Sequence, residues 1–398
     1  MPDNFLLIGV DGGATKINAC VINRDQNNLF SRGNLSAEIA YSEIHGYLSN
    51  FSPIDIRTQL VERENHSVNL TLEEEQQGSV IIEACAQAIE FIAKKSGHQN
   101  IIAGIGFPGL KTGDKRGIEA MANGPRMVHL SDLLEKRLQM KSINFVTPVN
   151  QLGSDADYCG IGENFSQNGL FRDVSTAYYL GGGTGAADAL KIEGELIPFD
   201  RIKDWMAKSW EMKNSKNVSL EQYTSAGGIQ KIYAVNMGVD PAEITGNNIF
   251  PDEIARRAVN GDSAAQDTFS QVSQNLAMLL FERITTLYAG WLSKFTFLNP
   301  DRQIPKKNHP CRGKYFDRIV IGQRLGELWN SPAGDKLIRM PVEDALDDLI
   351  QMEPALDLSA KKYYKSPGRL IKISELRDAP AIGAGIDAFM NWKNQNKD

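Results

Sequence analysis

An acidic residue, two glycines, a hydroxyl and a basic residue fall within one short segment near the start of the chain, at Asp11, Gly12, Gly13, Thr15 and Lys16. Each residue type has a use around a nucleoside triphosphate. Glycines let backbone N–H groups point at phosphate oxygens, Thr15 adds a hydroxyl donor, Lys16 adds positive charge, and Asp11 can hold magnesium through water. The segment is equally typical of a hairpin turn, because Asp-Gly is a common hairpin signal. Both interpretations stay open for this turn alone.

A second glycine-rich turn lies much further along the chain, with Gly183, Thr184 and Gly185 at its centre. An apolar strand precedes it and another strand follows. One such turn binds a phosphate weakly, whereas two facing turns can hold a triphosphate from both sides with backbone donors. A flexible glycine linkage would not explain why both turns carry threonine. The pair therefore favours phosphate binding.

Two carboxylates directly follow an apolar strand, in the segment Ser154-Asp155-Ala156-Asp157. Ser154 or Asp155 suits the N-cap of the helix that begins here, and a capping carboxylate needs no further role. An acid at the carboxyl end of a strand can also accept the proton of an attacking hydroxyl during phosphoryl transfer. The sequence leaves both roles open for Asp155.

The elements that must position these residues alternate between strands and helices. Residues 5–10 and 17–25 are predicted to form a hairpin, and residues 176–192 repeat this order of strand, turn and strand, which suggests two related halves. Walker and dinucleotide-binding loops lead into a helix instead, so neither is present. Helices are predicted over residues 79–95, 131–140, 156–163, 219–234, 252–259, 263–292 and 381–392, and further strands over 100–107, 143–150 and 317–322. The fold class is α/β, with mixed sheets because of the hairpins.

The length of 398 residues allows two or three domains. We place a smaller N-terminal α/β domain over residues 1–125 and a larger C-terminal α/β domain over residues 126–380. The last helix, about residues 381–398, is expected to return to the first domain. Residues 31–78 are polar and weakly periodic, and we interpret them as strand fragments within a long excursion.

Composition and charge narrow the range of partners. A net charge of −6, from 43 basic and 49 acidic residues, gives no field that would attract nucleic acid or anionic lipid. The four cysteines lack the spacing of a disulfide framework or a zinc cluster. The first apolar stretch runs into Asp11 without a positive flank, so it is no secretory signal. We expect a cytoplasmic protein with small-molecule partners, and with neither nucleic acid nor membrane.

Six blocks of the sequence resemble the sugar kinases of the ROK group (repressor, open reading frame, kinase), within the actin-like ATPase superfamily. The blocks follow the order of that group and occupy residues 11–16, 106–109, 122–125, 154–157, 181–185 and 319–322. They are scattered along the whole chain, and their order is more specific than any one of them. The resemblance implies two ribonuclease-H-like domains with mixed sheets around a central cleft, with ATP and magnesium on one side and a sugar on the other.

The resemblance also implies roles for individual residues. Asp155 resembles the general base of the group, which accepts the proton of the attacking sugar hydroxyl. Asn123 resembles a residue that binds sugar hydroxyls, and Asp157 stands where the group usually has an Asn beside the base. Gly109 belongs to the block over residues 106–109, which the resemblance places in the substrate-binding site. The positions that resemble the nucleotide site are Gly12, Gly13 and Thr15 in the first turn, Gly183, Thr184 and Gly185 in the second, and Gly322 beside the adenosine.

The sequence departs from the group after the second turn. The group carries a Glu-x-Gly-His sugar-binding motif and a cysteine-rich zinc motif there, whereas residues 195–225 contain neither Cys nor His. A structural zinc of the usual four-ligand type is therefore excluded in this segment. Glu211 and Glu221 could take over a sugar contact, but we favour the exposed face of a helix for both. Gln323 replaces a glycine that is usual in the adenosine turn.

The expected activity is ATP-dependent phosphorylation of a hexose or amino sugar, as in a glucokinase or an N-acetylhexosamine kinase, with ATP and Mg²⁺ but no zinc. Catalysis would depend mainly on positioning and charge neutralisation. Two alternatives stay open, an actin-like ATPase without a sugar acceptor and a sugar-responsive protein without catalysis. The repressors of the group carry an N-terminal helix-turn-helix that binds DNA. Because the first strand is predicted to start at Phe5, we do not expect such a domain in this sequence. Neither the sugar nor a homodimeric state follows from the sequence.

Overall fold

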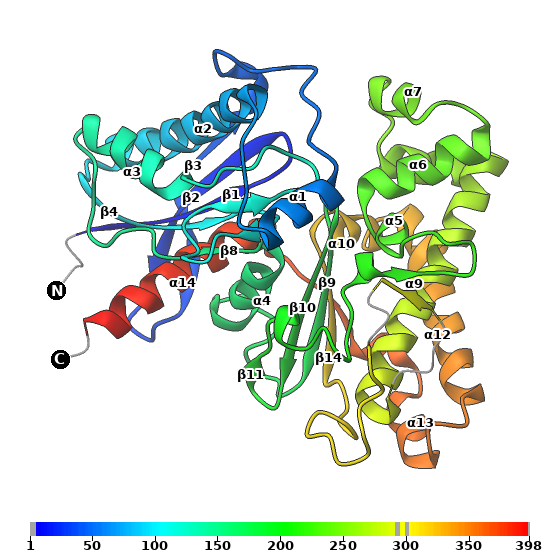
Figure 1. Cartoon of the computed structure of the whole chain (residues 1–398). Helices are drawn as coiled ribbons and strands as arrows, with labels where there is room; N and C mark the ends of the chain where they lie inside the picture. Colours follow the sequence, from blue (N-terminus) through cyan, green and yellow to red (C-terminus); the bar gives the residue numbers. More distant parts are fainter. Residues whose placement is uncertain (1–4, 291–294, 299–301, 397–398) are drawn as a thin grey trace. The chain divides into compact units, whose positions relative to one another are not determined.

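The computed structural model describes residues 5–290, 295–298 and 302–396 (Figure 1). Contacts within the chain divide it into unit 1, residues 1–169 and 378–398, and unit 2, residues 170–377. This division lies beyond the one expected near residue 125, because the chain from 126 to 165 packs into the sheet and helices of unit 1. The ends of two predicted segments, residues 291–292 and 397–398, lie outside the described residues.

Unit 1 contains a mixed sheet with the strand order β3-β2-β1-β4-β7, in which β8 also pairs with β4. The first three strands form an antiparallel meander, and β4 runs parallel to β1, β7 and β8. Of the predicted strand over 143–150, the structure has only Asn144–Phe145 (β7), since Pro148 interrupts the strand, and a separate short strand (β8) follows at Leu152–Gly153. The strand bounds are Leu6–Gly12 (β1), Lys16–Arg24 (β2), Phe30–Ala40 (β3), Asn100–Gly106 (β4), Asn144–Phe145 (β7) and Leu152–Gly153 (β8).

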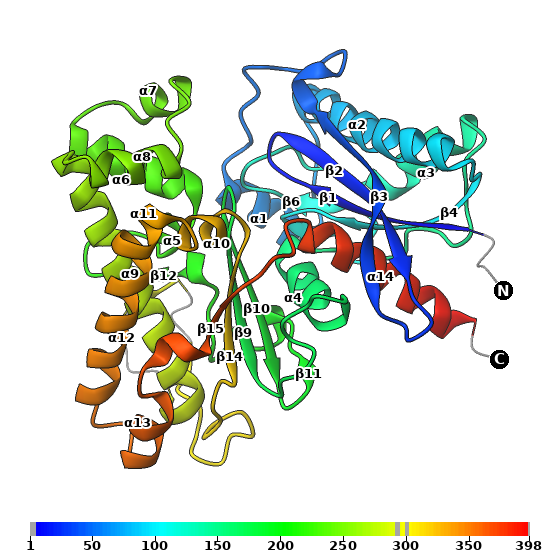
Figure 2. The same cartoon turned by 180° about the vertical axis from the view of Figure 1, so that it is seen from behind.

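Helices cover both faces of this sheet (Figures 1 and 2). On one face lie α2 (Leu72–Ser96) and α3 (Leu130–Met140), and on the other lie α4 (Asp155–Phe165) and the C-terminal α14 (Ala379–Gln395). The backbone of α14 packs directly on the strands, because a Cβ atom at Gly9 or Gly104 would lie 1.8 Å from a carbonyl oxygen of α14. A small hairpin of β5 (Leu110–Lys111) and β6 (Ile118–Ala120) follows β4, and α1 (Ile56–Glu64) lies beside β6.

Unit 2 contains a second mixed sheet with the strand order β11-β10-β9-β14-β15. Its first three strands again form an antiparallel meander, and β14 runs parallel to β9 and β15. Both units therefore share one topology, that of ribonuclease-H-like domains, as the repeated hairpin in the sequence indicated. The strand bounds are Ala177–Gly182 (β9), Ala186–Ile192 (β10), Glu195–Leu196 (β11), Arg318–Gly322 (β14) and Ile371–Ile373 (β15).

The helices of unit 2 pack around α9 (Ser263–Ala289), whose buried apolar residues join the core of that sheet. The predicted helix over 219–234 is two helices, because Ser225 ends the first and caps the second through the backbone N–H of Gly228. None of the helices in the described ranges is long and apolar enough to cross a membrane. The other bounds are Glu221–Thr224 (α5), Ala226–Met237 (α6), Pro241–Gly246 (α7), Pro251–Val259 (α8), Gln323–Trp329 (α10), Pro332–Gly334 (α11), Met340–Met352 (α12), Leu358–Tyr364 (α13), Met212–Lys213 (β12) and Thr296–Phe297 (β13).

Candidate active site

Three parallel strands of unit 1 end at one edge of its sheet. Asp11 of β1 lies in register with Gly106 of β4, and Gly106 lies in register with Gly153 of β8. The carboxyl end of β1 therefore carries Asp11, and the carboxyl end of β8 leads directly into Asp155. The topology brings these two predicted site residues to the same edge, although 143 residues separate them in the chain.

The first glycine turn joins β1 to β2 at this edge. The N–H of Gly13 donates to the carbonyl oxygen of Lys16 at 3.0 Å, and the Tyr41 hydroxyl donates to the carbonyl oxygen of Gly13 at 2.8 Å. The backbone N–H groups of the exposed residues Ala14 and Thr15 have no partner within the described ranges. The turn thus offers fixed backbone donors of the kind that bind phosphate oxygens.

Gly12 is required for close packing at the base of this turn. A Cβ atom there would lie 2.1 Å from the ring of Phe107, the residue that follows β4. Lys16 does not act as a free cation, because its ammonium group pairs with Glu38 of β3 at 2.7 Å. The pair is partly exposed, so it is weak enough to rearrange around an anion.

Asp11 lies among other carboxylates. Burial, together with the negative charges of Asp155 and Asp378, raises the pKa of Asp11 from 3.8 to about 7. Asp378 immediately precedes α14 and pairs with Arg32 at 2.6 Å. The carboxylates of Asp11 and Asp155 have no hydrogen-bond or ion-pair partner in the described part of the chain. This edge therefore suits a cation that would neutralise the carboxylates.

A magnesium ion fits the residues at this edge. Mg²⁺ usually keeps several waters and binds one or two carboxylates together with substrate phosphates. Within the described residues, no group of three or more His, Cys, Asp or Glu side chains is arranged to hold a metal. The protein would therefore supply one ligand to the ion, the carboxylate of Asp11, and water and nucleotide would supply the others.

Asp155 begins α4 but does not cap it. The hydroxyl of Ser154 accepts the hydrogen bond from the N–H of Asp157 at 3.1 Å and fills the N-cap role. Of the two predicted roles of Asp155, the cap is therefore taken by its neighbour. Asp157 lies one residue before the buried Tyr158, whose hydroxyl faces Asp387 of α14 at 3.4 Å.

The two remaining predicted substrate residues lie in and after the β5–β6 hairpin. Gly109 has a φ of +95°, and a Cβ atom there would lie 2.4 Å from the carbonyl oxygen of Ala120. Asn123 is exposed in the turn that follows Met121. Because Gly109 also lies against Met121, the structure brings Gly109 and the start of the Asn123 turn together.

The second glycine turn, in unit 2, joins β9 to β10. The N–H of Gly183 donates to the carbonyl oxygen of Gly185 at 2.9 Å. Gly181 lies in register with Gly322 of β14, so the predicted adenosine turn lies at the same edge of this sheet as the glycine turn. Gln323 has a φ of +57°, in the left-handed region that favours glycine, and its carboxamide lies over Gly183. The backbone thus keeps the conformation of a glycine turn although the side chain has changed.

The expected exposed positions of Glu211 and Glu221 are wrong, because both side chains are partly buried and hydrogen-bonded. Glu211 accepts a hydrogen bond from the N–H of Lys208 at 2.7 Å. Glu221 accepts one from the N–H of Ala186 at 3.0 Å, and its carboxylate lies next to Gly185. A carboxylate that the sequence did not indicate therefore lies beside the second turn.

Buried hydrogen bonds, together with an ion pair between α9 and β10, tie the segment without Cys or His to α9. Arg283 is fully buried and donates to Asp188 of β10 at 2.9 Å, to the carbonyl oxygen of Ala207 at 2.6 Å, and to Glu282 at 3.1 Å. Asp188 also accepts hydrogen bonds from the backbone and hydroxyl of Ser209. These charges cross-link the segment in which the ROK group carries its zinc motif.

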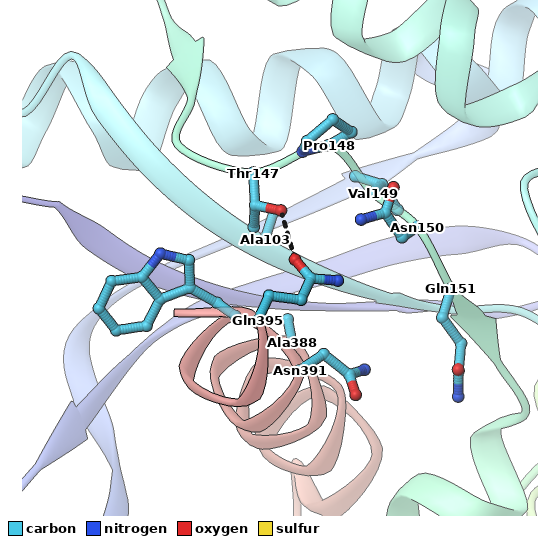
Figure 3. Close-up of a pocket in the computed structure, with 10 residues that line it drawn as sticks. Ala103, Thr147, Pro148, Val149, Asn150, Gln151, Ala388, Asn391 and Gln395 are labelled. Carbon is cyan, nitrogen blue, oxygen red and sulfur yellow. Dashed lines mark hydrogen bonds between the residues drawn. The ribbon is translucent and has the colours of Figure 1, made fainter. Parts of the chain in front are cut away.

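A separate groove lies between α14 and the connection from β7 to β8 (Figure 3). Thr147 of this connection donates a hydrogen bond to Gln395 across the groove at 3.5 Å. The lining is neutral and includes the carboxamides of Asn150, Gln151 and Asn391. No predicted site residue lines this groove, so it is distinct from the edge that carries Asp11 and Asp155.

Solved structures with the same fold cover nearly the whole chain. A ROK family glucokinase from Streptomyces griseus, in complex with glucose and AMPPNP, aligns with a TM-score of 0.57 over 97% of this chain and 99% of its own, at 16% identity. The ROK hexokinase from Thermus thermophilus aligns with a TM-score of 0.56 over 98% of this chain and 100% of its own, at 15% identity. The chain has the fold of the ROK sugar kinases.

The same fold also occurs in a regulator. A ROK family transcriptional regulator, a homolog of the E. coli MLC protein, aligns with a TM-score of 0.52 over 97% of this chain and 78% of its own, at 11% identity. No protein-family model matches the sequence, and no curated protein matches it. At these identities the similarity establishes the fold alone.

Proposed function

We propose that the protein transfers the γ-phosphoryl group of ATP to a hydroxyl of a hexose or an amino sugar. The observation that carries the proposal is the shared end of β1, β4 and β8, where Asp11 and Asp155 lie at one edge with unpaired carboxylates. The fold shared with sugar kinases supports it. Phosphoryl transfer asks mainly for positioning and charge neutralisation, which these residues can supply.

Asp155 is the proposed general base. It accepts the proton of the sugar hydroxyl while the hydroxyl oxygen forms a bond to the γ-phosphorus. The bond from that phosphorus to its bridging oxygen breaks, and ADP leaves with the electron pair. The cap hydrogen bond at the start of α4 is made by Ser154, so the Asp155 carboxylate is not used as the cap.

The nucleotide side of the proposal uses backbone donors. Ala14 and Thr15 would donate N–H groups to phosphate oxygens, with Gly12 and Gly13 allowing their close approach, and Asp11 would hold Mg²⁺ through water. The bound ion would neutralise charge on the phosphates. From unit 2, the proposal assigns the turn of Gly183, Thr184 and Gly185 to the phosphates and Gly322 to the adenosine. Asn123, Asp157 and Gly109 remain the proposed acceptor-side residues.

The direct test is sugar-dependent release of ADP by the purified protein with Mg²⁺ and ATP. We would assay glucose, mannose, N-acetylglucosamine, N-acetylmannosamine and a sugar acid in parallel. The proposal expects at least one of them to stimulate ADP release and to appear as a sugar phosphate. ADP release that no sugar changes would favour the actin-like ATPase, for which the missing Glu-x-Gly-His motif is the supporting observation.

A sugar-responsive protein without catalysis is the second candidate, because a transcriptional regulator shares the fold. Calorimetry separates this candidate from the kinase. A sugar that binds the protein but releases no ADP in the presence of Mg²⁺ and ATP would favour the regulator. A sugar that both binds and is phosphorylated would favour the kinase.

A further inference from the structure

The turn that carries Asn123 is closed at its base and exposed at its tip. Ile118 and Met127 exchange two backbone hydrogen bonds, each 3.0 Å long, so residues 119–126 form a loop between them. Within this loop, Ala122 and Asn123 are exposed, whereas Gly124, Pro125 and Arg126 are buried. A loop with an exposed polar tip needs anchors on both sides if the tip is to keep one position.

Gln59 of α1 provides the first anchor. Its fully buried carboxamide accepts a hydrogen bond from the N–H of Met121 at 2.7 Å and donates one to the carbonyl oxygen of Met121 at 3.1 Å. The same amide nitrogen donates to the carbonyl oxygen of Ile54 at 2.8 Å. One side chain thus satisfies both backbone groups of the residue two positions before Asn123.

Arg126 provides the second anchor. Its guanidinium group is fully buried and donates two hydrogen bonds of 2.7 Å to the carboxylate of Glu74 at the start of α2. It also binds Glu62 of α1 and the carbonyl oxygen of Asn69. Such a bidentate pair fixes orientation as well as position.

Both anchors involve the helix α1. Gln59, Glu62 and Arg63 lie on one side of α1, and each binds a residue of the 118–127 segment: Met121, Arg126 and Glu119 respectively. This side of α1 therefore holds the loop, although the helix exposes the apolar residues Leu60 and Val61 to solvent. The arrangement is unusual for a helix whose only function is to cover a core.

We infer that Gln59 and Arg126 are positioning residues for Asn123, and that α1 thereby sets the acceptor side of the proposed active site. This inference rests on the proposed function, because Asn123 is a sugar contact only if the protein binds a sugar. Neither residue touches the acceptor. Each fixes the backbone on one side of the Asn123 tip. The loop then loses less conformational entropy when the sugar binds.

The test compares Gln59→Met with Gln77→Met. Gln77 is a similarly buried glutamine of the same unit, and its carboxamide accepts a hydrogen bond from the N–H of Leu48, away from the Asn123 loop. For the sugar that is phosphorylated best in the panel above, we expect Gln59→Met to raise KM about tenfold or more. We expect kcat and the KM for ATP to change less than about threefold, and Gln77→Met to leave the sugar KM unchanged. Equal effects of both variants, or no effect of Gln59→Met, would overturn the inference.

A second readout needs no sugar. Hydrogen–deuterium exchange of the peptide that spans residues 118–127 should be faster in Gln59→Met than in the wild type and in Gln77→Met. Gln59→Leu, which is apolar, similar in size and removes the same hydrogen bonds, should also exchange faster and serves if Gln59→Met does not fold. Unchanged exchange in both Gln59 variants would overturn the anchoring role. If no sugar is phosphorylated but exchange rises as expected, the proposed function fails while the anchoring by Gln59 stands.

Discussion

The Ser154 hydroxyl accepts the hydrogen bond from the N–H of Asp157, so the cap of α4 does not use the Asp155 carboxylate that lies between them in sequence. Asp155→Asn should therefore keep the fold and ATP binding. It should reduce sugar phosphorylation at least about a hundredfold, because an amide cannot accept the hydroxyl proton. Steady-state kinetics and a thermal melt of the same preparation check both expectations.

Ser154→Ala is the matched control. Loss of the cap should lower the free energy of unfolding by about 1 kcal/mol, while turnover stays within a few-fold of the wild type. Turnover of Asp155→Asn close to that of the wild type would instead remove Asp155 from the reaction and would favour the ATPase without a sugar acceptor.

Asp11 should make stability depend on pH. Burial and the charges of Asp155 and Asp378 raise its pKa from 3.8 to about 7, so between these values the folded protein binds more protons than the unfolded chain. This contribution is present at low pH and is lost as the pH rises toward and through 7. We expect the melting temperature of Asp11→Asn, relative to that of the wild type, to be higher at pH 8 than at pH 5. A difference that does not change with pH would contradict the raised pKa.

Glu221 should weaken nucleotide binding at the second glycine turn. Its carboxylate accepts the Ala186 N–H and lies beside Gly185, where it would repel phosphate. Glu221→Gln keeps an acceptor and removes the charge, so ATP should bind about fivefold more tightly, the equivalent of about 1 kcal/mol. Glu211→Gln, which alters a similar backbone contact away from the turn, should leave the Kd for ATP unchanged. Calorimetry measures both. Weaker binding in Glu221→Gln would indicate that the carboxylate helps to hold the nucleotide complex.

The buried charges of unit 2 should stabilise it in the absence of zinc. Arg283→Met leaves the carboxylate of Asp188 buried without its guanidinium partner, while Glu282 keeps its ion pair with Arg302, and should cost about 3–5 kcal/mol of unfolding free energy. A chelator should not lower the melting temperature of the wild type, and elemental analysis should find no stoichiometric zinc. About one tightly held zinc per chain would contradict the ligand argument.

Local patterns were enough to predict much of the fold. The two glycine hairpins, the helices α3, α4, α8 and α14 and the strands β4 and β14 follow from turn residues and from apolar spacing. The helix predicted from residue 79 begins earlier, at Leu72 (α2). Thr71 and Glu74 form a capping box there, and their spacing in the sequence is typical of such a helix start. The helix α1 gave no periodic signal, because its inward side carries Gln59 and Glu62 while Leu60 and Val61 are exposed.

The site was predictable only in part. The edge that joins Asp11 to Asp155 depends on the parallel pairing of β1, β4 and β8, whereas the repeated hairpins of the sequence indicated only two related halves. Asp378 lies near Asp11 because of how α14 docks on the sheet, and no local pattern encodes a relationship over that distance in the chain. The carboxylate of Glu221 at the second turn likewise depends on the fold of residues 195–225, where the motifs of the family are missing.

The return of α14 to the first sheet has a consequence during synthesis. All of unit 2 is translated between Gly169 and the last helix, which takes about 10–40 s at ~5–20 residues per second. For that time Gly9 and Gly104 lack the helix that packs on them, since the atoms nearest to their Cβ positions belong to α14. The nascent first unit therefore keeps the part of this face that α14 will cover exposed, and this part is where a chaperone would be expected to bind. A chain that stops before residue 378 lacks the helix that covers this surface.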